Sequence, residues 1–286
     1  MRVSSVLLFA FVIISARAVA QQPPVPRVDT TAVVTVHLRD GSEITGRVWA
    51  ADDSSLTLLT FAGARVILPR GSILSWRQQA GRVTPGGFQR LDPNGSRLFF
   101  GPTARTLPKG SGYFADYYLF FPVAGVGVSN RVMMSGGVSL IPGLSSQLVY
   151  VAGKVGLVRE RQAAVALGGF WSTVPDEANA SLGMGYAVTT LGDDDRALTL
   201  MAGLPFTTQD VAREPLFMVG GETRTGRGTK LMTELWMLPE VSEVPALFGV
   251  RWFREKLAVD FGFVYVFGGG LEGWPFVPWV DFAVNW

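Results

Sequence analysis

The 286-residue chain contains no cysteine and a single histidine, His37. Without cysteine it forms no disulfide and offers no thiolate nucleophile. Metal centres built from several His and Cys ligands are excluded by this count. Because His37 is the single histidine, no histidine is available for a Ser–His nucleophile pair in the part of the chain that follows it. Three consecutive aspartates at 193–195 are more typical of a solvated turn than of a calcium site. We therefore expect no enzyme activity, no cofactor and no bound metal.

Long hydrophobic runs are also missing. After the first twenty residues, no segment offers the roughly 18 consecutive apolar residues that a transmembrane helix needs. Yet 48% of the residues are hydrophobic and the mean hydropathy is +0.28, which is high for a chain with 34 glycines. The apolar residues are spread over short alternating runs, as strands that show one face to lipid require.

An excess of positive charge is absent as well. The net charge is +2, and removal of Arg2 and Arg17 with an export signal leaves 23 basic and 23 acidic residues. Because there is no polybasic patch, the charge pattern indicates no nucleic-acid partner.

Residues 1–20 have the features of a cleavable signal peptide. A small basic n-region precedes an apolar core at 6–14 that is too short to span a bilayer, and an Ala-Val-Ala cleavage site follows at 18–20. An uncleaved anchor is the alternative. The mature chain then begins with a Pro-rich linker, residues 21–30.

Residues 31–78 predict a small β domain of five short strands. Asp40-Gly41 is a hairpin signal, and further turn residues follow each apolar run. Five strands in so short a segment suit a small, strongly bent barrel. Its expected core consists of Val34, Val36, Leu38, Ile44, Val48, Leu56, Leu58, Val66, Leu68 and Ile73.

The same segment contains the pattern Leu38-x-Asp40-Gly41-x-x-Ile44-x-Gly46, Asp53, Leu56-x-Leu58 and Gly63-x-x-Val66-x-Leu68-Pro69-x-x-x-Ile73. This pattern resembles the Sm-like and SH3-like small barrels. In Sm proteins an Arg-Gly pair near the last strand and an Asn in the loop holding the Asp contact RNA. Arg70-Gly71 matches the pair, but the loop reads Asp53-Ser54-Ser55 and lacks the Asn. The departure favours a periplasmic structural or docking module for a partner protein over RNA binding.

Residues 79–95 are rich in Gly and Pro and predict a second linker. From residue 96 onward the chain is a meander of alternating runs. We expect strands near 96–104, 113–128, 132–141, 147–158, 163–173, 181–191, 197–206, 215–224, 229–238, 246–253, 257–267 and 276–286. Tight polar turns alternate with longer breaks, as short periplasmic turns alternate with outer loops in outer-membrane barrels. An even count of about twelve places both barrel ends, and hence the small domain, in the periplasm.

The last predicted strand shows the lipid and lumen faces clearly. One face holds Val280, Phe282, Val284 and Trp286, and the other holds Asp281, Ala283 and Asn285. Together with the signal peptide, this alternation predicts an all-β protein: an antiparallel transmembrane meander barrel of about twelve strands over 96–286 in the bacterial outer membrane. An exported soluble β-sandwich, with the aromatic residues in its core, is the alternative.

Trp286 ends the apolar face that also holds Phe282 and Val284. This position resembles the C-terminal aromatic signal that the barrel-assembly machinery recognises. We therefore expect these three residues to direct insertion, with outer-membrane lipid and the assembly machinery as partners.

The start of the predicted barrel reads Asp92-Pro93-Asn94-x-Ser96-Arg97-Leu98-Phe99-Phe100-Gly101-Pro102-Thr103-Ala104, then Lys109-Gly110-x-Gly112-Tyr113-Phe114 and Phe120-Phe121-Pro122. It resembles an uncharacterised group of bacterial outer-membrane β-barrel proteins. The resemblance implies location and fold, and no activity carries over from it.

Charged residues are also expected inside the barrel. Alternation places Glu234, Arg251, Asp260 and Asp281 on the lumen face of four successive strands, with Lys154 reaching from the opposite wall. A basic residue facing lipid at mid-membrane costs about 2–4 kcal/mol, so the inward orientation is favoured.

Turn lengths give an expected register for this cluster. The tight turn at 254–256 sets Arg251 opposite about Ala258 and diagonal to Asp260. Similar counting sets Glu234 diagonal to Arg251, and Asp281 diagonal to Asp260. The result is one connected patch, which acts either as a salt-bridge plug or as a cation-attracting constriction. Because the charges nearly balance, the plug is favoured.

Two main functions remain open. The first is a non-enzymatic outer-membrane barrel that acts as a narrow pore or small-solute binding protein and carries a periplasmic docking domain. The second is a structural or assembly anchor with a plugged lumen. Solute, oligomeric state and partner are not encoded in any recognisable pattern.

Overall fold

The computed structural model describes residues 33–79, 81–84, 87–175, 181–269 and 276–286. The predicted signal peptide and the first linker lie outside these residues. The chain forms two compact units that divide between Gln78 and Gln79. None of the described segments is a helix of the length and apolarity that crossing a membrane requires.

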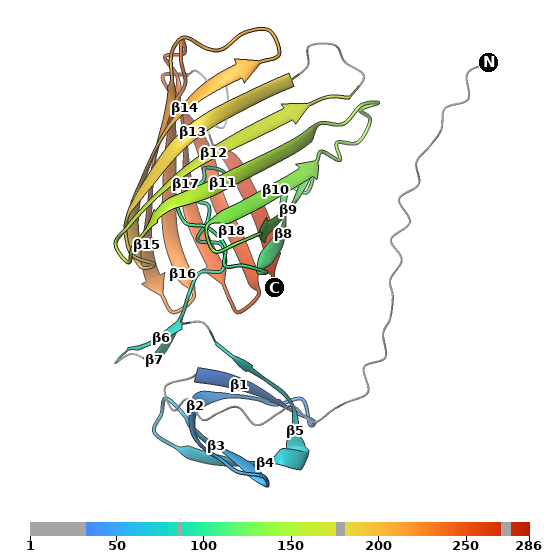
Figure 1. The fold of residues 1–286 in the computed structure, drawn as a ribbon, viewed down its shortest axis with the longest axis vertical. Coiled ribbons are helices and arrows are strands. Elements are labelled where there is room, and N and C mark those ends of the chain that lie inside the picture. Colours follow the sequence, from blue (N-terminus) through green and yellow to red (C-terminus); the bar gives the residue numbers. More distant parts are fainter. Residues whose placement is uncertain (1–32, 80, 85–86, 176–180, 270–275) are drawn as a thin grey trace, which may run out of the picture. The chain divides into compact units, whose positions relative to one another are not determined.

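The first unit is a five-stranded antiparallel sheet with the order β4-β3-β2-β1-β5 (Figure 1). Its elements are β1 (Val33–Leu38), β2 (Glu43–Ala51), β3 (Ser55–Leu59), β4 (Arg65–Pro69), the 3-10 turn η1 (Arg70–Ser72) and β5 (Ile73–Gln78). Gly41 and Gly63 close two of the hairpins with left-handed φ values of +87° and +84°, which glycine adopts without steric cost. The five predicted strands are present; the likeness to Sm-like and SH3-like barrels stays a prediction.

The core of this unit is small, and we predict that residues 31–78 still fold alone. Leu58 is fully buried at 0% exposure, whereas Leu74 is 59% exposed. Leu58→Ala in the isolated segment should lower the free energy of unfolding by about 2–5 kcal/mol, enough to unfold a marginal domain. Leu74→Ala is the matched control and should change it by less than about 0.5 kcal/mol. Circular dichroism during thermal unfolding measures both, and a wild-type segment without a cooperative transition would refute the prediction.

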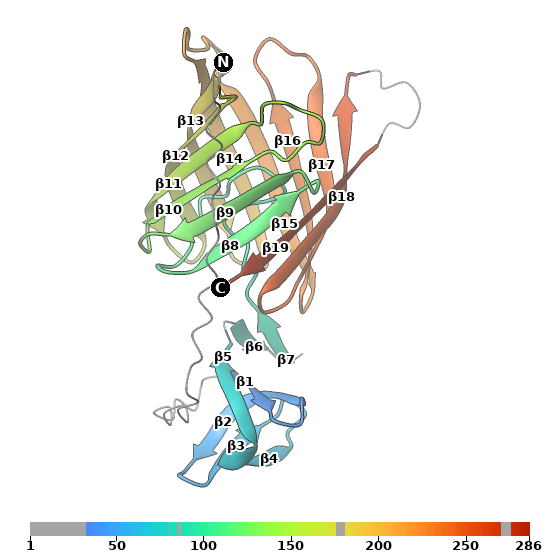
Figure 2. The ribbon, with the colours of Figure 1, turned by 90° about the vertical axis from the view of Figure 1, so that its right-hand side faces the viewer.

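The second unit is a closed barrel of twelve antiparallel strands (Figure 2). The strands are β8 (Gly112–Tyr117), β9 (Phe121–Gly127), β10 (Val132–Val138), β11 (Val149–Arg159), β12 (Ala163–Thr173), β13 (Ser181–Gly192), β14 (Arg196–Thr207), β15 (Leu216–Gly226), β16 (Thr229–Met237), β17 (Val244–Phe253), β18 (Leu257–Phe267) and β19 (Val277–Asn285). Pairing of β19 with β8 closes it, with Ala283 opposite Ala115. The predicted all-β fold and the count of twelve are confirmed.

One strand of the prediction is wrong. Residues 96–104 do not form the first barrel strand. The long run predicted at 113–128 is instead two strands, β8 and β9, because Tyr118 and Leu119 turn the chain with φ values of 54° and 63°. The two differences cancel, so the total is still twelve.

The barrel has two distinct ends. The connections at 128–131, 160–162, 193–195, 227–228 and 254–256 are short and define the tight-turn end. The chain enters and leaves the barrel at this end, where the backbones of Gly112 and Trp286 exchange hydrogen bonds of 3.0 and 3.2 Å. The opposite end carries most of the longer connections and is here called the long-connection end.

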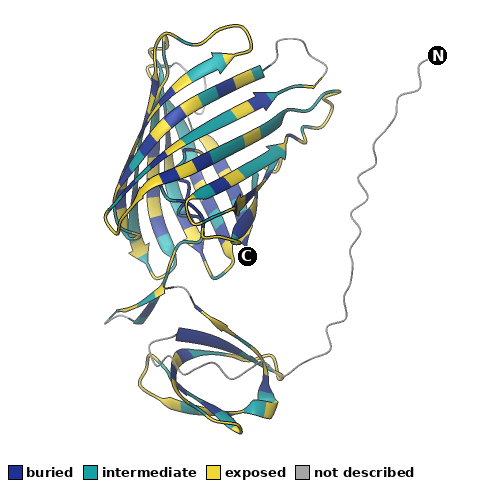
Figure 3. Cartoon of the chain, viewed as in Figure 1, coloured by how far each residue is buried: buried dark blue, intermediate teal, exposed yellow. Residues whose placement is uncertain are grey.

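Burial alternates along the barrel strands as the sequence pattern predicts (Figure 3). On β18, Leu257 and Phe261 are exposed, whereas Ala258 and Asp260 are buried. Exposed apolar residues of this kind surround the barrel and include Val126, Met134, Val151, Val155, Leu167, Leu198, Leu200, Phe217, Leu231, Phe248, Trp252, Val280 and Val284. An apolar belt of this extent is far larger than the patches that soluble monomers expose.

The predicted second linker contains a hairpin that belongs to the barrel unit. Its strands are β6 (Gly81–Thr84) and β7 (Gly87–Arg90). Arg82 forms an ion pair with Asp195, in a tight turn of the barrel. Arg224 donates to the same Asp195 at 2.6 Å and to the carbonyl of Arg90 at 3.0 Å. These contacts fix the hairpin against the tight-turn end.

Candidate functional site

Residues 91–111, between β7 and β8, are here called the inserted segment. The segment enters the barrel and lies inside it, except for its exposed end at 108–110, which leads to β8 (Figures 1 and 2). The segment makes a tight turn at its tip, where Leu98 N–H donates to the Gly101 carbonyl at 2.9 Å and Thr103 N–H donates to the Ser96 carbonyl at 3.1 Å. Leu98 and Phe99 are both fully buried. Residues predicted to cross the membrane therefore fill the lumen instead.

Local chemistry explains why this segment turns. The Asp92 carboxylate accepts from Asn94 N–H at 2.9 Å, and Thr103 Oγ1 donates to the Gly95 carbonyl at 2.6 Å. Such side-chain contacts with the backbone replace the ladder bonds that a strand would make. Pro102 at the tip offers no N–H for a central strand.

Arg251 on β17 is the central cation of the lumen and has 0% exposure. Its guanidinium binds both carboxylate oxygens of Asp260, with Nε–Oδ1 at 2.7 Å and Nη2–Oδ2 at 2.6 Å. It also donates to the inserted segment, to the carbonyls of Leu98 at 2.7 Å and Asn94 at 3.0 Å. One side chain therefore joins the barrel wall to the segment within it.

Asp260 and Asp281 face each other directly across β18 and β19. Two opposed buried carboxylates repel each other unless a cation lies between them. Arg97 of the inserted segment supplies that cation: its Nη1 lies 3.1 Å from Asp260 Oδ2 and its Nη2 lies 2.8 Å from Asp281 Oδ1. Arg251 alone would leave the wall one positive charge short.

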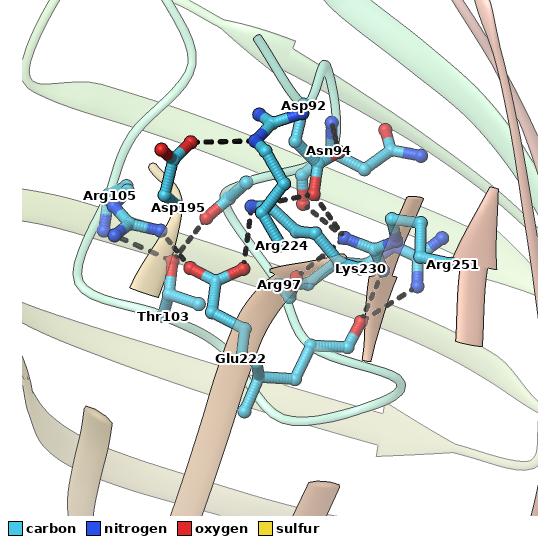
Figure 4. Close-up of polar contacts among 12 residues, drawn as sticks. Asp92, Asn94, Arg97, Thr103, Arg105, Asp195, Glu222, Arg224, Lys230 and Arg251 are labelled. Carbon is cyan, nitrogen blue, oxygen red and sulfur yellow. Dashed lines mark hydrogen bonds and ion pairs between the residues drawn. The ribbon is translucent and has the colours of Figure 1, made fainter. Parts of the chain in front are cut away.

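A second group of ion pairs lies toward the tight-turn end (Figure 4). Lys230 Nζ lies 2.8 Å from Glu222 Oε2 and 3.2 Å from Asp92 Oδ2. Arg105 pairs with the other oxygen of Glu222, and Arg251 lies 3.2 Å from Asp92. Cations and carboxylates alternate from the inserted segment to the wall, so the charges are matched pair by pair.

Asp92 belongs to the inserted segment and not to a barrel strand. Burial by itself raises the pKa of its carboxyl, but the positive charges of Lys230 and Arg251 outweigh this effect and hold the pKa well below its usual range. Asp92 is therefore ionised at any physiological pH, and the pairs that anchor the segment persist.

The predicted register needs correction. Arg251 pairs with Asp260, not with Ala258, and Asp281 lies directly opposite Asp260 instead of diagonal to it. Glu234 lies opposite Leu247 and makes no ion pair with Arg251. The turns hold a different number of unpaired residues from the one assumed, and a shift of two positions preserves the face while changing the partner.

Glu234 has a different role from the predicted one. It is fully buried and accepts from the backbone N–H groups of Phe100 and Gly101 at 3.3 and 3.0 Å, and from Trp236 Nε1 at 3.1 Å. These donors sit at the tip of the inserted segment. Glu234 therefore holds the tip against β16.

Lys154 does reach inward, but it binds carbonyl oxygens. Its Nζ donates to the carbonyls of Ser96 at 2.9 Å and Thr103 at 2.6 Å, both in the inserted segment. Within the part of the chain that the structure describes, no carboxylate lies within 4.0 Å of it. Lys154 is thus in the lumen without joining the predicted ion-pair patch.

Sequence reasoning missed five charged residues of the lumen, namely Asp92, Arg97, Arg105, Glu222 and Lys230. The inward orientation of Lys230 could have been predicted from the alternation of faces, since Lys230 lies four residues before Glu234 on the same face of β16. The charged residues of the inserted segment could not be found in this way, because the alternation of faces applies only to strands.

A cavity of about 490 Å³ remains on the other side of the inserted segment, toward the long-connection end. Phe100 at the tip of the segment forms part of its wall and is 56% exposed. Most of the other lining side chains are aromatic or aliphatic, including Tyr117, Phe170, Met184, Tyr186 and Trp236. Its size and lining are those of a pocket for a small, largely apolar molecule.

Across the described ranges, no group of three His, Asp or Glu side chains is arranged to hold an ion. In the acidic turn, Asp195 pairs with Arg82 and Arg224. His37 lies in the first unit, 3.0 Å from Glu43.

No protein-family model and no curated protein matches the chain. Among solved structures it is similar to the KdgM porin in complex with disordered oligogalacturonate, with a TM-score of 0.43 and 10% identity over 61% of this chain and 95% of that one. The NanC porin gives 0.40 and 11% over 61% and 97%. A loop-deletion mutant of OmpT, an outer membrane protein of Vibrio cholerae, gives 0.35 and 13% over 90% and 97%.

Proposed function

We propose that this protein is a bacterial outer-membrane barrel whose lumen is closed by its own inserted segment and whose remaining cavity binds a small, mainly apolar solute. The apolar exterior supports the membrane location, and the predicted signal peptide supports export. The observation that carries the proposal is the division of the lumen: buried ion pairs occupy the tight-turn half, and an apolar cavity of about 490 Å³ occupies the other half. We expect no enzymatic activity.

We propose a periplasmic location for the tight-turn end and for the small N-terminal unit. Short turns face the periplasm in outer-membrane barrels, and the chain enters the barrel at its tight-turn end. The small unit would then serve as a docking module for a periplasmic protein.

A structural anchor is the second candidate. The density of buried ion pairs in the lumen and the separate small unit favour it, since both fit a barrel whose task is to hold a periplasmic module at the membrane. The two candidates differ in one respect: only the first requires the cavity to be occupied.

The closed lumen is tested in planar lipid bilayers. The purified full-length protein should give no steady conductance at neutral pH, and it should fractionate with outer membranes. A steady conductance in the wild type would contradict the closed lumen, and recovery in the soluble fraction would contradict the membrane location.

Binding is tested with decanol, a small neutral amphiphile, by calorimetry on protein held in amphipol. Ala152 lies opposite Phe170 and lines the cavity, so Ala152→Trp should fill the space and abolish binding. Val151 on the same strand is 48% exposed, and Val151→Trp is the matched control that should bind normally. If decanol binds neither to the wild type nor to the control, the structural anchor is the better interpretation of this protein.

We propose that Trp286, with Phe282 and Val284, contacts the barrel-assembly machinery. Trp286 is 57% exposed at the seam between β19 and β8, and its backbone is already bonded to Gly112. Trp286→Ser should therefore lower the folded, heat-modifiable fraction in outer membranes while leaving the purified, refolded barrel intact. Trp252→Ser changes an outer-face tryptophan that is 48% exposed and is the control. Equal insertion of both variants would mean that Trp286 is an ordinary lipid-facing residue.

A further inference from the structure

We propose that the cavity takes an amphipathic acid, with its carboxylate at Lys154 and its apolar body between the aromatic side chains. This inference deepens the proposed function and rests on it. It names the chemical class of the solute and the residues that select it.

Lys154 is the first reason. It lies in the cavity wall with 4% exposure, and its only hydrogen-bond partners in the described part of the chain are two carbonyl oxygens. An ammonium group has three N–H donors, so one is left over. Every other buried cation of the lumen faces a carboxylate. A buried charge without a counter-ion is costly, and a ligand carboxylate would supply the missing one.

Two further donors on the same wall lack partners. Ser96 Oγ and Arg97 Nε are buried and make no hydrogen bond, although both residues line the cavity. Buried polar atoms without partners are rare in folded proteins. Ser96 is also the residue whose carbonyl accepts from Lys154, which places its hydroxyl near the ammonium group. The Lys154 ammonium and the Ser96 hydroxyl together match a carboxylate, which has several acceptor positions.

The rest of the cavity selects the body of the ligand. Away from this polar corner the lining consists largely of residues such as Phe100, Phe170, Met184 and Trp236. A sugar acid or other polyhydroxylated anion would find few partners for its hydroxyls there, and desolvating them without replacement disfavours binding. An acyl or aromatic body fits, so the expected ligands are acids such as medium-chain fatty acids.

Decanoate and decanol make a matched pair of probes, because they share the chain and differ in the head group. In calorimetry on the full-length protein in amphipol, decanoate should bind at least about tenfold more tightly than decanol, as expected for charge-assisted hydrogen bonds. Lys154→Met should remove this preference while decanol binding persists. Lys109→Met, an exposed lysine outside the cavity, should keep the preference. Acetate, which lacks the chain, should not compete.

Ser96→Ala keeps the proposal testable if Lys154→Met does not fold. Ser96 Oγ has no partner to lose, so this variant should fold normally and still bind decanoate several-fold more weakly. Equal binding of decanoate and decanol by the wild type, or an unchanged preference in folded Lys154→Met or Ser96→Ala, would overturn the anion site while the proposed cavity function stands. Failure of both probes to bind would overturn the proposed function itself. Competition by acetate would overturn the amphipathic ligand, because it would mean that only a simple anion is recognised.

Discussion

Arg251→Ala is expected to destabilise the closed barrel by about 3–5 kcal/mol, the cost of leaving a buried ion-pair partner unmatched. Arg251 binds Asp260 through two hydrogen bonds and holds the inserted segment through the carbonyls of Leu98 and Asn94. Its removal therefore weakens the wall and the segment at once. The urea midpoint of the heat-modifiable band should fall, and intermittent conductance should appear in planar bilayers as the segment leaves the lumen.

Arg213→Ala is the matched control, since Arg213 is exposed in a connection at the long-connection end. It should change stability by less than about 0.5 kcal/mol. The competing interpretation is a cation-attracting constriction. In that case Arg251→Ala would keep its stability and conduct from the start, with selectivity shifted toward cations. A variant that stays stable and silent would contradict both interpretations.

The architecture of the barrel could be predicted because every second residue of its strands lies on an apolar outer face. On β18, exposed Leu257 and Phe261 alternate with buried Ala258 and Asp260, which is the pattern expected of strands that face lipid. The same pattern identifies which charged residues face inward. The face of each strand residue therefore follows from local sequence alone, whereas the count of twelve was reached because two errors in the strand list cancelled.

The pairing register between neighbouring strands is predicted less well from the sequence, because it depends on turn geometry. Arg251 was expected opposite Ala258 and lies opposite Asp260, a shift of two positions that leaves both side chains in the lumen. The periodicity of the sequence does not reveal such a shift, because side chains alternate between faces every two residues. The prediction of an inward Arg251 close to Asp260 survives it, whereas the contact predicted between Glu234 and Arg251 does not.

The inserted segment could not be placed from periodicity. Leu98, Phe99 and Phe100 imitate a strand, but partners more than 100 residues away stabilise this stretch. Arg251 donates to the Leu98 carbonyl, and Glu234 accepts from Phe100 N–H. The available signal was composition: Pro93, Pro102 and Pro108 within a short stretch argue against a central strand. A further signal was the surplus of carboxylates on the wall, which requires cations from elsewhere.

Replacement of residues 91–106 by a Gly/Ser sequence of equal length removes the cations that match the surplus of carboxylates on the barrel wall. The side chains that anchor the segment are lost, so the lumen should open and show steady conductance where the wild type shows none. Water would then reach the wall charges and solvate them, which lowers the cost of leaving them unpaired. The barrel should therefore remain folded and heat-modifiable, because its strand pairing and apolar belt are unchanged.

The opened barrel should also prefer cations. The buried wall charges that remain are Lys154, Lys230 and Arg251 against Glu222, Glu234, Asp260 and Asp281, which leaves one negative charge in excess. A reversal potential measured across a salt gradient should show this selectivity, and adding Asp281→Asn should remove most of it. Asp210→Asn, in the connection after β14, is the control and should leave it unchanged. If the replaced barrel stays closed, the inserted segment is not what seals the lumen, and the ion pairs around Arg97 serve packing alone.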